Sequence, residues 1–126
     1  MAGMRGIRGA ITIQENDAEQ IRQATHELLE EIVRRNSLAP ADIVSAIFTL
    51  TKDLDAAFPA AFARQLGWDR VPMLCLNEIP VPGSLPRCIR VLLHVESPLS
   101  QEEIQPVYLR DAVNLRRDLM ENADVD

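Results

Sequence analysis

The sequence has few of the residues and motifs on which metal, nucleotide or covalent catalysis depends. It contains two cysteines and two histidines in 126 residues. Cys75 and Cys88 have the spacing of neither a zinc site nor a redox Cys-x-x-Cys motif, and His26 and His94 are too scattered to suggest metal ligands. A glycine-rich phosphate loop and a Gly-x-Ser-x-Gly nucleophile elbow are both missing. We therefore expect no metal, no cofactor and no covalent intermediate.

Long apolar runs are missing too. No run approaches the roughly 20 residues that a membrane span needs, and the N-terminus has no hydrophobic signal segment. The chain carries 19 acidic and 13 basic side chains, a net charge of −6, which disfavours nucleic acid because phosphate binding requires a basic face. A local cluster of arginines can nevertheless bind a small anion. We expect a cytoplasmic protein with reduced cysteines that binds neither membranes nor nucleic acid.

The length predicts one domain over residues 1–126. A chain of this size can bury roughly two-thirds of its unfolded surface, which is enough for an independent core. The last residues, roughly 119–126, are polar and are expected to form a mobile tail.

Predicted strands and helices alternate along the chain. The strongest helix is predicted over 17–35, where apolar residues recur with a helical period, with Asn16 as its N-cap and Glu19 completing a capping box. A shorter helix is predicted over 59–66, with a proline in its first turn. Strands are predicted at 4–13, 43–50, 71–76 and 88–96, residues 102–107 fit a strand or a helix equally well, and 109–119 form a short helical turn.

These elements predict an α+β, or α/β-like, fold: a mixed sheet of about five strands packed with one long and one short helix. Residues 43–50 are almost continuously apolar, which is typical of a strand buried on both faces. Two helices cannot cover both faces of such a sheet, so part of one face needs another cover. Self-association is the simplest source, and a closed ring of subunits would place sites between neighbours.

Arg8 and Arg90 are the leading functional candidates. Each lies among apolar residues in a segment predicted to be a buried strand. A guanidinium keeps its charge in proteins, so a buried one requires an anionic partner. Few carboxylates lie near these strands in sequence, which makes a bound anion a candidate partner. Two alternatives remain open: an ion pair with a distant Asp or Glu, and an arginine on the solvent-facing side of a half-exposed strand.

Several segments in this order carry a resemblance to a known family. They are Arg5-Gly6-Ile7-Arg8-Gly9-Ala10, Asp53-Leu54-Asp55-Ala56-Ala57-Phe58-Pro59-Ala60, Gly67-Trp68, Val71-Pro72, Cys75-Leu76-Asn77-Glu78, Cys88-Ile89-Arg90-Val91, Val107-Tyr108-Leu109 and Leu115-Arg116. The chain resembles the monofunctional chorismate mutases that form a trimeric α/β barrel, as distinct from the all-helical chorismate mutases. The resemblance implies a pseudo-α/β barrel formed by a homotrimer, with sites at the subunit interfaces. It implies conversion of chorismate to prephenate, in the shikimate pathway toward phenylalanine and tyrosine, without a cofactor.

The resemblance also implies residue roles. Arg8 and Arg90 would bind a substrate carboxylate and the ether oxygen, and Glu78 would accept a hydrogen bond from the ring hydroxyl, which makes these three the catalytic candidates. The further substrate-binding candidates are Tyr108 and Arg116 on the same subunit's side, Phe58, Arg64, Met73, Leu74 and Cys75 from the adjacent subunit, and Leu76, Asn77 and Leu115. Ala61 and Leu74 stand where a lysine and a small polar residue are common, and we expect these departures to affect affinity more than activity.

The chemistry of the implied reaction agrees with what the sequence lacks. Chorismate is a dianion, and its rearrangement is intramolecular, so the reaction needs no acid, base or nucleophile. Negative charge develops on the ether oxygen, where a fixed cation stabilises the transition state more than the ground state. Two rival hypotheses are a non-catalytic trimer that binds a small carboxylate and an imine-hydrolysing trimer of similar shape. Glu78 together with Arg90 favours the mutase, because a simple carboxylate sensor needs no carboxylate of its own to recognise a hydroxyl.

Overall fold

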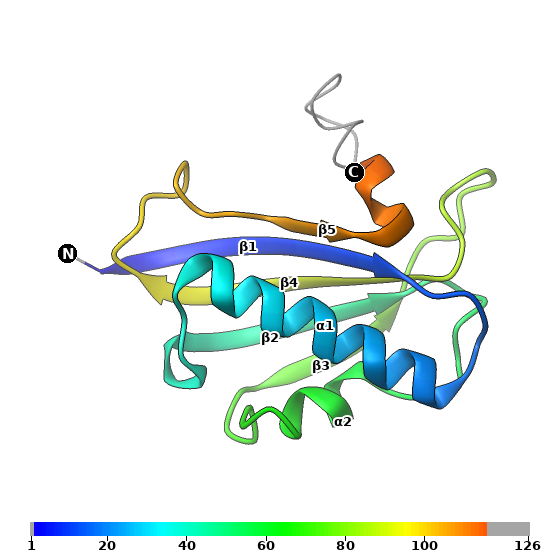
Figure 1. Ribbon diagram of the computed structural model, residues 1–126, viewed down its shortest axis with the longest axis horizontal. Coiled ribbons are helices and arrows are strands. Elements are labelled where there is room, and N and C mark those ends of the chain that lie inside the picture. Colours follow the sequence, from blue (N-terminus) through cyan, green and yellow to red (C-terminus); the bar gives the residue numbers. More distant parts are fainter. Residues whose placement is uncertain (1, 116–126) are drawn as a thin grey trace.

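The computed structural model describes residues 2–115, which form a five-stranded mixed sheet and two helices (Figure 1). The strands are β1 (Gly3–Thr12), β2 (Ile43–Leu50), β3 (Met73–Asn77), β4 (Cys88–Ser97) and β5 (Val107–Leu109), and the helices are α1 (Ala18–Asn36) and α2 (Pro59–Arg64), with 3-10 turns at Pro40–Asp42 and Arg110–Ala112. The strand order is β3-β2-β4-β1-β5. Strands β1 and β2 run antiparallel to β4, while β3 is parallel to β2 and β5 is parallel to β1. The predicted α+β class and the mixed sheet are confirmed.

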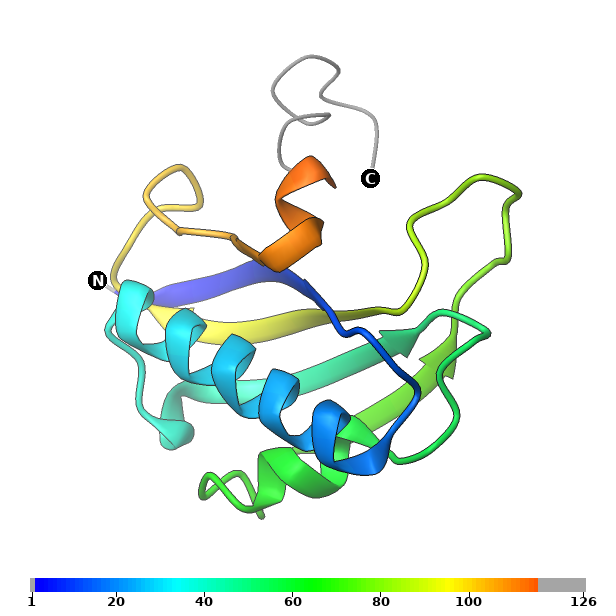
Figure 2. The ribbon, with the colours of Figure 1, turned by 45° about the vertical axis from the view of Figure 1, so that its right-hand side comes forward.

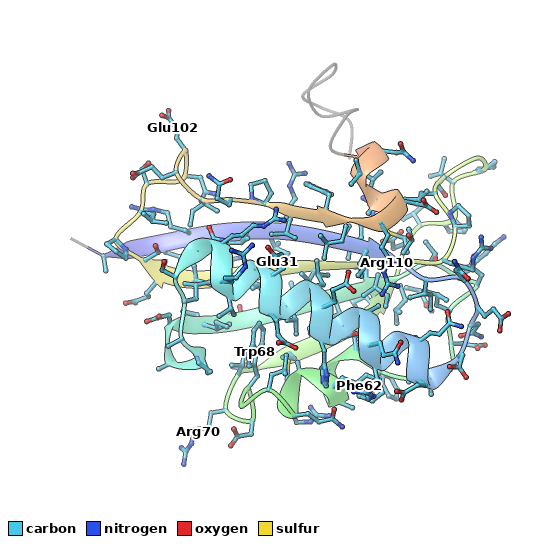
Figure 3. All side chains as sticks on the ribbon, in the orientation of Figure 1. Glu31, Phe62, Trp68, Arg70, Glu102 and Arg110 are labelled. Carbon is cyan, nitrogen blue, oxygen red and sulfur yellow. The ribbon has the colours of Figure 1, made fainter. Side chains whose placement is uncertain are left out.

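Both helices pack on the same face of the sheet (Figures 1 and 2). The apolar stripe of α1 is fully buried there, as Leu28 and Ile32 illustrate with no exposed surface. Gly9 in β1 allows this close packing, because a Cβ atom at that position would lie 2.7 Å from Cδ1 of Ile32. Trp68, which follows α2 and is labelled in Figure 3, belongs to the same core and is 1% exposed. The single core therefore lies between the sheet and the two helices.

The outer face of α1 is charged and solvated, as its sequence predicts. Glu19 pairs with Arg22, and Glu31 pairs with Arg34 and Arg35. The hydrogen bond from Arg22 lowers the pKa of Glu19, and those from Arg34 and Arg35 lower the pKa of Glu31. Such exposed pairs within one helix add little to stability.

The predicted N-cap of α1 is wrong by one residue. Asp17 is the cap, and its carboxylate accepts the backbone N–H of Gln20 at 3.0 Å. The side chain of Asn16 instead accepts the backbone N–H groups of Asp55 and Ala56, both at 3.0 Å, and donates to the Asp55 carboxylate. An amide can donate and accept at once, whereas a carboxylate can only accept. Asn16 therefore suits this link between the start of α1 and the loop before α2.

Neither described helix covers the second face of the sheet, which we call the open face; Ala112 and Leu115 pack over one end of it, against Ala10 and Tyr108. The side chains of the open face alternate along each strand with those of the core. They are Met4, Arg8, Ala10, Ser45, Ile47, Thr49, Leu74, Leu76, Arg90, Leu92, His94 and Tyr108. The prediction that residues 43–50 are buried on both faces is wrong for a single chain, because Ser45, Ile47 and Thr49 are only half-buried. Leu74 and Leu76 are 61% and 48% exposed.

Residues 102–107, which fitted a strand or a helix, are mostly neither. They form a turn, and the short strand β5 begins only at Val107. The 3-10 turn at Arg110–Ala112 then leads to Leu115, the last described residue. Arg110, labelled in Figure 3, donates to the carbonyl of Thr12 at 3.0 Å and to the carboxylate of Glu27 at 3.1 Å. These bonds tie the turn to β1 and α1. The predicted tail at 119–126 lies outside the described residues.

Neither α1 nor α2, the two described helices, combines the length and the apolar character that a membrane span requires.

Candidate active site

The two arginines lie on the open face, and their predicted burial in apolar strands is wrong for a single chain. Arg8 is exposed, and the side chain of Arg90 is 26% exposed. The strands are buried on the helix side only, so an arginine at an alternate position reaches the other side. In the register of β1 and β4, Ala10 lies opposite Arg90 and Arg8 lies opposite Leu92. Arg8 and Arg90 are therefore diagonal neighbours on one face, a separation that long side chains can bridge.

A pocket of about 270 Å³ lies between these arginines. Its lining comes from four strands and consists of Arg8, Gly9, Ala10, Ile47, Thr49, Arg90, Val91, Leu92 and Tyr108. Tyr108 is 5% exposed and belongs to a small cluster with Ala10 and Cys88, against which Leu115 packs. The structure thus brings together Arg8, Arg90, Tyr108 and Leu115, all predicted from the sequence. Arg116 is also predicted but lies outside the described residues.

Arg90 has a protein counter-ion. Its Nε lies 2.9 Å from Oε1 of Glu78, whose side chain is 15% exposed. This ion pair is the distant-carboxylate alternative that the sequence left open. Glu78 directly follows β3, and its backbone N–H donates to the carbonyl of Leu50 at 2.9 Å. Arg8 lines the same pocket, so two guanidinium groups reach it from the described strands, and a local cluster of arginines can bind a small anion despite the acidic chain.

The start of β4 is fixed by hydrogen bonds from the loop after β2. The Asp53 carboxylate accepts the backbone N–H of Arg87, and the Thr51 hydroxyl accepts that of Cys88 at 3.0 Å. Thr51 also donates to Asp53. Arg87 has a φ of 48°, in the left-handed region that non-glycine residues seldom adopt. These bonds hold that turn and set the position of Arg90 two residues beyond Cys88.

The remaining candidates form a second group. A separate hollow beside the end of β3 is lined by Leu50, Leu54, Asp55, Ala56, Ala57, Phe58, Cys75, Leu76 and Asn77. Phe58 is 70% exposed, and Asn16 holds the loop that precedes it. Met73 and Cys75 are half-buried and pack against the core, whereas Leu74 and Leu76 point to the open face. Arg64 is exposed at the last position of α2.

Sequence reasoning missed six residues that line the first pocket: Gly9, Ala10, Ile47, Thr49, Val91 and Leu92. The side chains of Ile47, Thr49 and Leu92 lie on the open face. These three residues occupy every second position of apolar strands. A strand that is interpreted as buried on both faces gives no reason to assign them to a pocket. The register reveals them, because Thr49 lies opposite Arg90 and Ile47 lies opposite Leu92. Within residues 2–115, no cluster of His, Cys, Asp and Glu could hold a metal ion.

The comparisons with known proteins agree with this geometry. The model of the family described as chorismate mutase type I matches residues 4–119. The chain belongs to this family. It is 51% identical over 117 residues to chorismate mutase AroH of Thermus thermophilus, covering 92% of this chain and 96% of that protein. It is 44% identical over 117 residues to chorismate mutase AroH of Bacillus subtilis, covering 92% of each.

A solved structure shows the same fold. The chorismate mutase from Clostridium thermocellum matches with a TM-score of 0.86 and 50% sequence identity, covering 87% of this chain and 98% of that one. The family resemblance expected from the sequence is therefore confirmed. Membership makes the chain an isomerase of the chorismate mutase type.

Proposed function

We propose that this chorismate mutase converts chorismate to prephenate, in aromatic amino acid biosynthesis, at three sites between the subunits of a homotrimer. The observation that carries the proposal is the pocket lined by Arg8 and Arg90, with Glu78 paired to Arg90. Two arginines suit a dianionic substrate, and the added carboxylate suits a substrate that also carries a hydroxyl.

Arg90 supplies the electrostatic part of the mechanism. As the ether C–O bond breaks ahead of C–C bond formation, negative charge grows on the ether oxygen. A guanidinium held beside that oxygen stabilises the transition state more than the bound substrate. Removing one donor from comparable oxyanion sites costs about 2.7–4 kcal/mol. Glu78 and the backbone of β4 hold the guanidinium in advance, so little reorganisation accompanies the reaction.

The rest of the pocket holds the substrate in its reactive shape. Arg8 binds a carboxylate, Glu78 accepts a hydrogen bond from the ring hydroxyl, and Tyr108 and Leu115 close one side. Arg116 remains a further substrate-binding candidate. Chorismate must fold before its ends can react, and a pocket that holds the folded conformer supplies that orientation. The reaction then needs no proton transfer and no covalent intermediate.

The trimer is supported by the division of the candidate residues. Arg8, Arg90 and Tyr108 line one pocket of the chain and Glu78 pairs with Arg90, while Phe58 and Cys75 line a different hollow. In the proposed ring, the second group of one subunit, together with Arg64, Met73, Leu74, Leu76 and Asn77, completes the first group of its neighbour. The open face, with its exposed leucines, forms the interface of the pseudo-α/β barrel. Ala61 and Leu74 weaken affinity more than turnover.

A cytoplasmic location is part of the proposal, since Cys75 and Cys88 are free thiols and a reducing compartment keeps them so.

The test is the loss of chorismate's ultraviolet absorbance when purified protein is added, with prephenate identified as the product. Saturable turnover supports the mutase. Chorismate that binds without reacting would instead favour the carboxylate-binding rival, and release of ammonia from an imine substrate would favour the hydrolase. Either result, with no mutase activity, would overturn the proposal.

A further inference from the structure

Thr49 lies where the parts of the proposed site meet. It belongs to β2, between Arg90 on β4 and Leu76 on β3, and is directly opposite each in the sheet register. Its hydroxyl donates to Oε1 of Glu78 at 2.8 Å. It also lines the pocket that contains both arginines. Thr49 thus contacts the carboxylate from within the site.

We propose that Thr49 is a positioning residue for Glu78, which it holds in the orientation that receives the substrate hydroxyl. This inference rests on the proposed function. Within the part of the chain that the structure describes, both side-chain contacts of Glu78 fall on Oε1, one from Thr49 and one from Nε of Arg90. The hydrogen bond from Thr49 on β2 and the ion pair with Arg90 on β4 meet at one oxygen, and together they restrict the rotation of the carboxylate. Oε2 is then the oxygen that meets the hydroxyl.

The ion pair with Arg90 would not fix that orientation alone. A carboxylate can rotate about one charged partner and still keep most of the attraction, because charge attraction is less directional than a hydrogen bond. A glutamate that turned further onto Arg90 would also offset the charge needed at the ether oxygen. Thr49 opposes this rotation, and its β-branched side chain has a restricted χ1, so its hydroxyl points in a defined direction.

The first experiment compares Thr49→Val with Thr49→Ser. Valine keeps the branched shape but removes the donor, and serine keeps the donor but loses the branching. We expect Thr49→Val to lower kcat by roughly ten- to 150-fold, the range for a hydrogen bond to a charged group, with KM changed less than about three-fold. Thr49→Ser should restore kcat to within about three-fold of the unmodified protein. A role limited to packing predicts the reverse order, with valine active and serine impaired.

The matched control is Ser45→Ala. Ser45 is on the same strand and the same face, and its hydroxyl pairs with Nδ1 of His94 at 3.0 Å, away from Glu78. Its removal should leave kcat within about two-fold, so an effect at Thr49 would not reflect the mere loss of a polar contact on this face. All variants are compared for melting temperature and oligomeric mass.

The second experiment repeats Thr49→Val in a Glu78→Ala background. A residue that acts through Glu78 has nothing left to position there, so the residual kcat should change by less than about two-fold. A loss as large as in the unmodified background would overturn the inference and leave the mutase proposal intact. An unmodified protein that does not turn over chorismate would overturn both.

Discussion

At the scale of single residues, the proposed site depends on the charge of Arg90. Arg90 lines the pocket from a strand whose alternate side chains are buried on the helix side, and its Nε pairs with Glu78. Replacing Arg90 by citrulline keeps the shape and most donors but removes the charge. We expect kcat to fall by about two to three orders of magnitude while KM changes far less, because the charge matters most in the transition state.

Steady-state kinetics on folded variants of unchanged oligomeric mass measure this effect. Arg90→Lys should recover only part of kcat, since an ammonium is a point charge and lacks the planar fork of a guanidinium. If citrulline left kcat within about three-fold, near the thermal energy scale, Arg90 would bind substrate only. The electrostatic role would then pass to Arg8.

Cys75 presents the opposite case, a reactive residue type in a packing role. Its side chain is half-buried and packs against the core beside the hollow of Phe58. We expect Cys75→Ser to retain most of kcat with a modest change in KM, because the rearrangement needs no thiolate. Complete loss of activity in a folded Cys75→Ser protein would show that the thiol does more than pack. The measurement is steady-state kinetics on the variant and on the unmodified protein, each before and after treatment with a thiol reagent.

The residues of the pocket were easier to predict than their surroundings. Arg8 and Arg90 attract attention in sequence because a charge in an apolar strand needs an explanation. Which face they occupy depends on where the helices pack, and the pairing of Arg90 with Glu78 depends on β2 lying between β3 and β4. The packing of the helices and the order of the strands are properties of the assembled fold, and no single segment of the sequence encodes them. Thr49 escaped notice for the same reason.

At the scale of elements, segment types were predictable and their ends were not. The predicted helix over 17–35 differs from α1 by one residue at each end. Asn16 and Asp17 are about equally good N-caps, so the residue types alone do not decide which one caps the helix. Residues 102–107 combine apolar and polar side chains without a clear period. Their turn is fixed by contacts made elsewhere in the chain, such as the bonds of Asn36 to the backbone of Gln105 at 2.7 and 3.0 Å.

The two candidate caps give a prediction that separates stability from function. Asp17→Ala removes the cap and should cost about 1 kcal/mol of unfolding free energy, with kcat/KM unchanged. Asn16→Ala removes the bonds that hold Asp55 and Ala56, next to Phe58. It should raise KM several-fold, because Phe58 belongs to the proposed substrate surface. Denaturant unfolding and steady-state kinetics on both variants measure the two effects. If Asn16→Ala had the same KM as the unmodified protein, the loop that contains Asp55 and Ala56 would not contribute to substrate binding.

At the scale of the whole molecule, the open face is the part of a single chain that still needs a covering layer. Only one face of the sheet is covered by helices (Figure 2). The other exposes Leu74 and Leu76, which lie opposite the pocket residues Ile47 and Thr49 in the register. Apolar surface of this kind favours association. We expect light scattering at micromolar concentration to give three chain masses. A stable monomer mass under these conditions would contradict the shared-site proposal.

Subunit mixing tests whether the sites are shared. Arg90→Ala disables the first group of residues, and Arg64→Ala disables the second, so each homotrimer should have little activity. In a closed ring where each site takes one group from each of two neighbours, every mixed trimer contains one site with both groups intact. Random assembly of equal amounts should therefore restore about a quarter of the unmodified activity. Sites contained within one subunit predict no gain on mixing. Refolding the two variants together and separately, then measuring chorismate turnover at equal protein concentration, distinguishes the two arrangements.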